Sequence, residues 1–222
     1  MKYLLYIILI VVVLITTGCV SENQKTVVTP TKTATIPTIV VKTTLSPPAT
    51  AKPTTLVLTT TPAPAFLTFI DQGIVFDYPS YLSTAASLQQ MKSILQSQGV
   101  ELITVLRSSD NLLTLQVGRQ QNPASIESLI EDKRAISDTV NSQGMTLMGE
   151  KFIKYTVSKI TLPKQGVLVM GYAEKDNGQT GISYWQLHGG YEYAIIFIYP
   201  NAQSADSGQA IRTAVIDSIR FT

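Results

Sequence analysis

Two side chains in this sequence could take part in covalent or metal chemistry, and each occurs once. The only histidine, His188, directly precedes two glycines. A catalytic histidine works beside a nucleophile and an orienting acid, and no Gly-x-Ser-x-Gly sequence accompanies it. Structural zinc sites need several His or Cys ligands. Asp176-Asn177-Gly178 begins like a calcium-binding loop, but the later acids are missing, so an ordinary turn is expected. The sequence predicts no catalytic residue, metal site or cofactor.

The only cysteine, Cys19, follows a short apolar segment at the N-terminus. Residues 3–15 are all apolar or aromatic and lie behind a single charge, Lys2. This length suits a signal peptide and is short for a membrane span, which needs roughly 20 residues. Thr16, Thr17 and Gly18 then place small side chains next to Cys19.

The sequence around Cys19 resembles a lipobox, the processing site of lipoproteins. The resemblance implies removal of residues 1–18 and a diacylglyceryl-type lipid on the Cys19 sulfur. One position departs from the pattern, because Thr16 stands where leucine is usual. The alternative is an uncleaved signal anchor. Both readings place the rest of the chain outside the cytoplasmic membrane, attached to that membrane.

A stalk, residues 19–65, follows the cysteine. From residue 20 to 65 it holds 14 Thr and 7 Pro among 46 positions, with no Gly and no aromatic residue. Such a composition buries too little apolar surface to offset the entropy of ordering the backbone. We expect a disordered, extended stalk that holds a domain of residues 66–222 away from the membrane. That domain carries 12 basic and 14 acidic residues without a basic stripe, which argues against nucleic acid as a partner.

Aromatic residues gather on one predicted hairpin near the end of the chain. They are Tyr184, Trp185, His188, Tyr191 and Tyr193. If exposed near the hairpin tip, Tyr184 or Trp185 with His188 and Tyr191 could stack on a sugar or anchor a protein. The alternative, which the sequence favours, is that these rings pack in the core.

The remaining pattern predicts strands, helices and a two-sided sheet. Helices are expected over 83–98, from Asn122-Pro123 to Gln143, and over 204–217; strands are expected over 65–70, 74–78, 100–107, 112–117, 146–153, 155–162, 166–174, 180–187, 191–199 and 219–221. In 191–199 and 167–172 both alternating sets of side chains are largely apolar, so both faces should be covered. Strand 112–117 should lie nearer an edge. The charged face of the middle helix, which includes Glu127, Lys133 and Asp138, should be solvated. The fold class is α+β, an antiparallel sheet sandwiched by about three helices.

This order of elements resembles the PsbP/Mog1 fold. The residues that carry the resemblance are Phe76-Asp77-Tyr78-Pro79 and Ile216-Asp217-Ser218-Ile219-Arg220-Phe221. Many relatives have a tryptophan shortly after the early proline, where this chain has Tyr81. The resemblance implies a non-enzymatic binding or assembly module and transfers no ligand residue.

The sequence therefore predicts a cell-envelope lipoprotein that presents a binding domain outside the membrane, with a protein or small molecule as partner. Two alternatives stay open. One is a surface hydrolase that uses two carboxylates in a cleft. The other is a purely structural or adhesive surface component.

Overall fold

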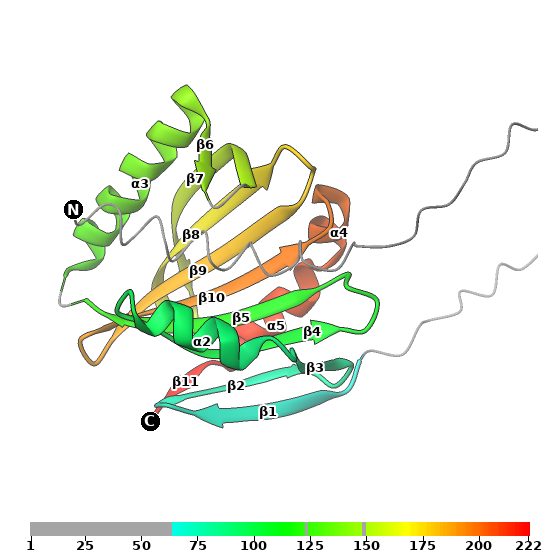
Figure 1. Ribbon diagram of the computed structural model, residues 1–222. Coiled ribbons are helices and arrows are strands. Elements are labelled where there is room, and N and C mark those ends of the chain that lie inside the picture. The colour runs from blue at the N-terminus through cyan, green and yellow to red at the C-terminus, as the bar shows by residue number, and fades with distance from the viewer. Residues whose placement is uncertain (1–63, 123, 148–149) are drawn as a thin grey trace, which may run out of the picture. The chain divides into compact units, whose positions relative to one another are not determined.

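The computed structural model describes residues 64–122, 124–147 and 150–222 (Figure 1). The expectations for the signal peptide, for Cys19 and for the stalk up to residue 63 lie outside these residues. In chain order the elements are β1 (Phe66–Asp71), β2 (Ile74–Pro79), β3 (Leu82–Thr84), α2 (Leu88–Gln96), β4 (Val100–Ser108), β5 (Thr114–Gln121), α3 (Ile126–Gln143), β6 (Met145–Leu147), β7 (Glu150–Leu162), β8 (Gly166–Lys175), β9 (Thr180–His188), β10 (Tyr191–Tyr199), α4 (Ala202–Ser207), α5 (Gln209–Ser218) and β11 (Arg220–Phe221).

A large antiparallel sheet forms the centre of the domain, in the order β3-β4-β5-β10-β9-β8-β7-β6. A small sheet, β1-β2-β11, packs beside it. Helices α2 and α3 cover one face of the large sheet, and α4 and α5 lie on the other (Figure 1). The predicted α+β class, an antiparallel sheet between helices, is confirmed.

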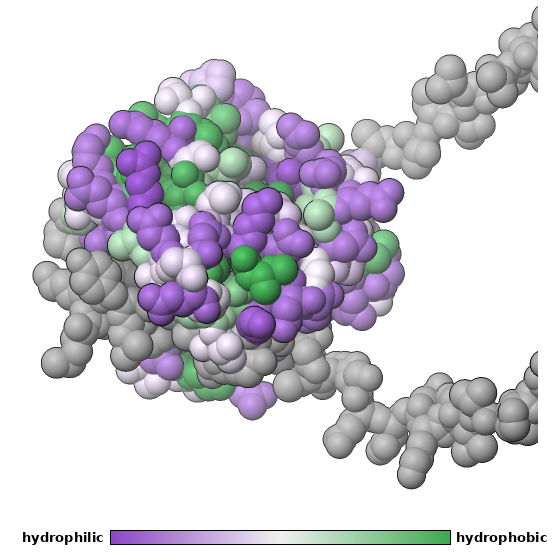
Figure 2. All heavy atoms as spheres, turned by 90° about the horizontal axis from the view of Figure 1, so that it is seen from above, coloured by the Kyte–Doolittle hydropathy of each residue, from purple (hydrophilic) through white to green (hydrophobic). Residues whose placement is uncertain are grey.

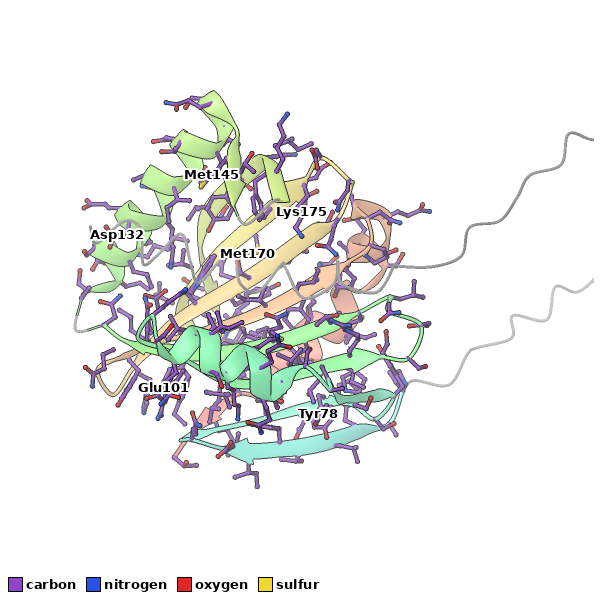
Figure 3. All side chains as sticks on the ribbon, in the orientation of Figure 1. Tyr78, Glu101, Asp132, Met145, Met170 and Lys175 are labelled. Atoms are coloured by element: carbon purple, nitrogen blue, oxygen red, sulfur yellow. The ribbon has the colours of Figure 1, made fainter. Side chains whose placement is uncertain are left out.

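The two faces of the large sheet support two separate hydrophobic cores. Along β10, Ala194, Ile196 and Ile198 face the core under α2 and α3. The alternate residues Ile195 and Phe197 face the core under α4 and α5. Every residue of β10 after Tyr191 is buried. In β8, Val169 faces the first core and Leu168 the second, each with 0% of its surface exposed. The prediction that both faces are covered is confirmed for β10. In β8 it holds only in part, because Val167 is exposed and Met170, labelled in Figure 3, and Tyr172 are half-buried.

Strand β5 is central, and the expectation of a strand near an edge was wrong. It pairs with both β4 and β10. The strand starts later than predicted and runs on to Gln121, so its polar residues lie inside the sheet. Gln120 is buried because its side-chain amide donates to the Glu192 carboxylate, 2.9 Å away. A buried polar group with such a partner does not mark an edge.

Helix α3 begins later than predicted. Its N-cap is Ser125, whose hydroxyl accepts a hydrogen bond from the Ser128 N–H at 3.3 Å. Asn122 instead points into the domain, where it bonds Glu192. The predicted cap was therefore a residue with a tertiary role, and the helix uses the next suitable serine.

The last predicted helix is divided in two, α4 and α5, at Gly208. A Cβ at this position would lie 2.6 Å from the Tyr199 hydroxyl, so the chain needs glycine where it passes that ring.

The strands expected over 146–153 and 155–162 are also different: β7 is one long strand with an irregularity between Phe152 and Lys154, and β6 is a short strand before it.

On the face seen from above in Figure 2, hydrophilic residues predominate and apolar ones are scattered. Within residues 64–122, 124–147 and 150–222, no helix is long and apolar enough to cross a bilayer.

Candidate binding site

An aromatic cluster forms where β5, β9, β10 and β11 meet, and it joins rings from distant parts of the sequence. It consists of His188, Tyr191, Tyr193 and Phe221, with Arg119 beside it. Tyr191 pairs with His188 across the β9–β10 hairpin and with Gln121 on β5. Strand alternation places His188, Tyr191 and Tyr193 on the sheet face that also carries α5.

The rings of the cluster are in direct contact. His188 stacks on Phe221, with the ring centroids 4.4 Å apart and the planes inclined by 10°. Tyr193 lies 4.7 Å from the same phenylalanine. His188 is exposed, whereas Phe221 is half-buried and Tyr193 is buried. The cluster therefore exposes the His188 ring to solvent, while the buried Tyr193 ring packs against its partner Phe221.

Arg119 closes the other side of the aromatic cluster. Its guanidinium lies 4.5 Å from the Tyr191 ring centroid, a cation–π distance. Its Nε donates to the Glu101 carboxylate at 2.6 Å, and an Nη donates to the Gln72 carbonyl at 2.7 Å. Partial burial lowers the pKa of Arg119, but the Tyr193 hydroxyl and the Glu101 carboxylate outweigh it and raise that pKa overall. Arg119 is thus a fixed positive charge that ties β5 to the β1–β2 turn.

The four candidate residues from the sequence do not form one surface patch. Trp185 has 0% of its surface exposed and belongs to the core under α2 and α3, on the opposite sheet face from its neighbour Tyr184. The interpretation of Trp185 as a surface ring was wrong, and core packing holds for it. Tyr184 is half-buried and meets Phe197 edge to face. His188 is exposed and Tyr191 is half-buried, and both belong to the aromatic cluster.

A surface groove lies beside the cluster, and we call it the C-terminal groove. Its lining comes from β2, the β7–β8 turn and the end of α5, through Asp77, Lys164, Gln165, Ala214, Asp217, Ser218, Ile219 and Arg220. Arg220, which lines the groove, directly precedes the cluster residue Phe221 in β11, so the groove and the cluster are neighbours along this strand. The sequence could not show this groove, because its residues come from three separate segments of the chain.

Gln165 holds the groove together. Its side-chain amide donates to the carbonyls of Ile219 and Asp217, at 3.0 and 3.3 Å. Its own carbonyl accepts from the Gln186 side chain at 3.0 Å. On the facing wall, the Ser218 hydroxyl accepts from the Asp77 N–H at 2.8 Å. These backbone groups are therefore satisfied internally, so the charged ends of Lys164, Asp217 and Arg220 remain for a ligand. One oxygen of the Asp77 carboxylate already accepts a hydrogen bond from the Thr68 hydroxyl at 2.7 Å.

A second polar group, which we call the buried ion-pair network, lies on the opposite face of the sheet under α3. The Lys133 ammonium contacts the Glu192 carboxylate at 2.7 Å, and both side chains have 0% of their surface exposed. Gln120 and Asn122 donate to the second carboxylate oxygen at 2.9 and 2.8 Å. The Lys133 ammonium also lies 4.7 Å from the Trp185 ring. The expectation that Lys133 belongs to a solvated helix face was wrong, whereas Glu127, Glu131, Arg134 and Asp138 of that face are exposed.

Tyr155 lies close enough to this network to give it a pH dependence. Burial raises the pKa of the Tyr155 phenol far above its ordinary value of 10.0, and the negative charge of Glu192 raises it further. The folded chain keeps this proton at a pH where the unfolded chain loses it. The stability that follows is fully present below about pH 10 and is lost as the pH rises above that value.

We expect the free energy of unfolding to fall less steeply between about pH 10 and pH 12 in Tyr155→Phe than in the unchanged chain. Urea unfolding across this range measures the slope. At pH 7 the two chains should have similar stability, because the Tyr155 hydroxyl has no hydrogen-bond partner among the described residues. Equal slopes above pH 10 would contradict the prediction.

Metal binding finds no support within the described ranges, where no three His, Cys, Asp or Glu side chains gather closely enough to hold an ion. The Asp176–Gly178 segment forms a turn, in which the Gln179 N–H donates to the Asn177 side chain at 3.0 Å. This is the ordinary turn that the sequence favoured.

No protein-family model and no curated protein matches the chain. Solved structures similar to it include the cyanobacterial PsbP protein (CyanoP) of Synechocystis sp. PCC 6803, with 14% identity, a TM-score of 0.47, and coverage of 73% of this chain and 96% of that one. The Ran-binding protein Mog1p of Saccharomyces cerevisiae has 10% identity, a TM-score of 0.46, and coverage of 72% and 96%. A protein from Bacteroides thetaiotaomicron has 14% identity, a TM-score of 0.39, and coverage of 70% and 48%. The chain is thus similar in fold to PsbP and Mog1 proteins, the resemblance that the sequence predicted.

Proposed function

We propose that this chain is a lipid-anchored protein of the cell envelope whose domain binds a polypeptide segment and catalyses no reaction. The observation that carries the proposal is the C-terminal groove, with the stacked pair of the exposed His188 and the half-buried Phe221 next to it along β11. The lipid would be attached to Cys19, and the stalk would hold the domain outside the membrane.

The charges of the groove favour a polypeptide over other ligands. Its carboxylates, Asp77 and Asp217, are balanced by two cations, Lys164 and Arg220. A phosphate or nucleic-acid site is dominated by cations, and a calcium site is dominated by oxygen ligands. A polypeptide offers side chains of both charges and backbone amides. Binding surfaces of this kind also use aromatic anchors surrounded by polar groups.

Binding can be tested with the mature chain carrying Cys19→Ser, by thermal shift against peptides, sugars, divalent metals and common metabolites. A peptide at about 100 times its dissociation constant should stabilise the domain by about 2.7 kcal/mol. We expect Lys164→Glu with Arg220→Glu to remove this shift. Arg134→Glu with Lys151→Glu makes the same charge change at exposed positions outside the groove and should preserve it. A ligand whose shift survives the groove variant would contradict the assignment of the site.

The anchor needs a separate test in cells. With Cys19→Ala, incorporation of a labelled fatty acid should be lost, and the protein should no longer fractionate as a lipoprotein. Release of the variant into the medium supports the lipid anchor. If the unchanged chain takes up no label and the variant stays in the membrane, the uncleaved signal anchor is correct.

One observation keeps a hydrolase as a second candidate. Asp77 and Asp217 line the same groove, and a pair of catalytic carboxylates must share a cleft. Turnover of glycoside or peptide substrates that is lost in both Asp77→Asn and Asp217→Asn would favour this candidate over the binding domain.

A further inference from the structure

Strand β1 leaves an unusual edge open on the small sheet. It is the outermost strand and pairs only with β2 among the described residues (Figure 1). Three of its six residues are large exposed apolar side chains: Phe66, Leu67 and Ile70, with exposed fractions of 39%, 48% and 73%. Asp71 is its only charged residue. An exposed, apolar edge strand is a template for pairing with another strand, and proteins usually protect such edges with charges, proline or a bulge.

The hydrogen-bonding groups of the open edge follow from the pairing with β2. The Ser80 N–H donates to the Ala65 carbonyl at 2.8 Å, at the end of this antiparallel ladder. Hydrogen-bonded positions alternate along such a ladder, so the odd-numbered residues of β1 bond to β2. Phe66, Thr68 and Ile70 therefore direct both their N–H and their C=O groups away from β2. None of the three is proline, so the edge offers three donors and three acceptors.

We propose that this edge pairs with the β1 strand of a second copy, in an antiparallel register centred on Thr68. This register places Thr68 opposite the Thr68 of the second copy and Phe66 opposite Ile70. All six backbone groups of each edge then find a partner. On the other face, Leu67 comes opposite Phe69, so each exposed apolar side chain meets an apolar one. The two small sheets become one continuous sheet related by a twofold axis, the usual symmetry of a homodimer.

Charge supports a second copy as the occupant. In the Thr68-centred register, Asp71 lies opposite Ala65, so no two like charges face each other across the new ladder. The segment that precedes β1 is a poor alternative. It reaches the strand through Thr61-Pro62-Ala63-Pro64, where residues before proline favour extended backbone and oppose the tight reversal that a hairpin needs.

Cysteine cross-linking in membranes of cells that express the full chain tests the register. Cα atoms of directly opposed, hydrogen-bonded residues lie about 5.5 Å apart, within the range of a disulfide. We expect Thr68→Cys to give a disulfide-linked dimer on mild oxidation. Ile70→Cys is the matched control on the same face of β1: its two copies would be four residues out of register, roughly 13 Å apart, and should not cross-link. The unchanged chain reports any dimer formed through Cys19.

A proline variant tests the backbone pairing. Thr68→Pro removes an N–H that points away from β2, so the backbone bonds between β1 and β2 stay intact. It also removes the bond from the Thr68 hydroxyl to Asp77 on β2, a loss that the control Thr68→Ala shares. Sedimentation of the detergent-solubilised chain should show a dimer for the unchanged protein and for Thr68→Ala, and a monomer for Thr68→Pro with an unchanged circular dichroism spectrum. Equal cross-linking at positions 68 and 70, no cross-link at position 68, or a monomeric unchanged chain would overturn the proposal.

Discussion

Lys133→Met should destabilise the folded domain by about 3–5 kcal/mol, because it leaves the Glu192 carboxylate buried without its counter-charge. Both side chains of the pair are fully buried, 2.7 Å apart. The two amides that donate to Glu192 do not replace a positive charge. Chemical denaturation at pH 7 measures the loss as a shift of the unfolding midpoint.

Two controls separate the buried charge from the loss of the lysine itself. Lys159→Met breaks the exposed pair with Glu127, at 3.7 Å, and should change stability by less than about 1 kcal/mol. Adding Glu192→Leu to Lys133→Met removes the orphaned carboxylate and should restore part of the lost stability. A double variant as unstable as the sum of the single variants would show that the two charges are not coupled.

Gly171→Ala should destabilise the domain by about 3 kcal/mol, since there is no room for a methyl group at this position. A Cβ built on Gly171 lies 2.7 Å from two carbons of the Trp185 ring and 2.8 Å from the Ser183 hydroxyl. The ring is fully buried and cannot swing aside. Thermal unfolding, followed by the fluorescence of this sole tryptophan, measures the effect.

Trp185→Phe is the matched rescue for Gly171→Ala. The smaller ring lacks the carbons that clash, although it loses packing of its own. Thermal unfolding of Trp185→Phe and of the double variant is followed by circular dichroism. Gly171→Ala should lower the stability much less in the Trp185→Phe background than in the unchanged chain. The same cost in both backgrounds would place the clash elsewhere.

The sequence predicted the features that depend on local pattern. Strand β10 shows this most clearly: apolar residues at both odd and even positions indicated burial on two faces, and Ile195 and Ile196 lie in the two different cores. The helix expected over 83–98 likewise contains α2, whose buried residues are Met91 and Leu95.

The features that the sequence did not predict depend on partners far along the chain. Lys133 lies at the spacing of a charged helix face. Its burial can be understood only from its ion pair with Glu192, which is 59 residues further along the chain. Trp185 follows Tyr184 in the sequence, so the two rings point to opposite faces of the sheet. The alternation alone does not say which face α2 and α3 cover and which face carries α5. The C-terminal groove is lined by residues of β2, of the β7–β8 turn and of the end of α5, so no single stretch of sequence contains it.

The small sheet joins the two ends of the folded sequence. Strand β11 pairs with β2, Arg220 opposite Val75, and the Thr222 N–H donates to the Gly73 carbonyl at 3.1 Å. The β1–β2 hairpin is synthesised well before its neighbour β11, which is about 140 residues further along the chain. Such a long-range closure is slow, because chain entropy opposes it until most other contacts exist. Until β11 pairs with β2, both edges of the hairpin are open, so removal of residues 219–222 should favour aggregation over folding.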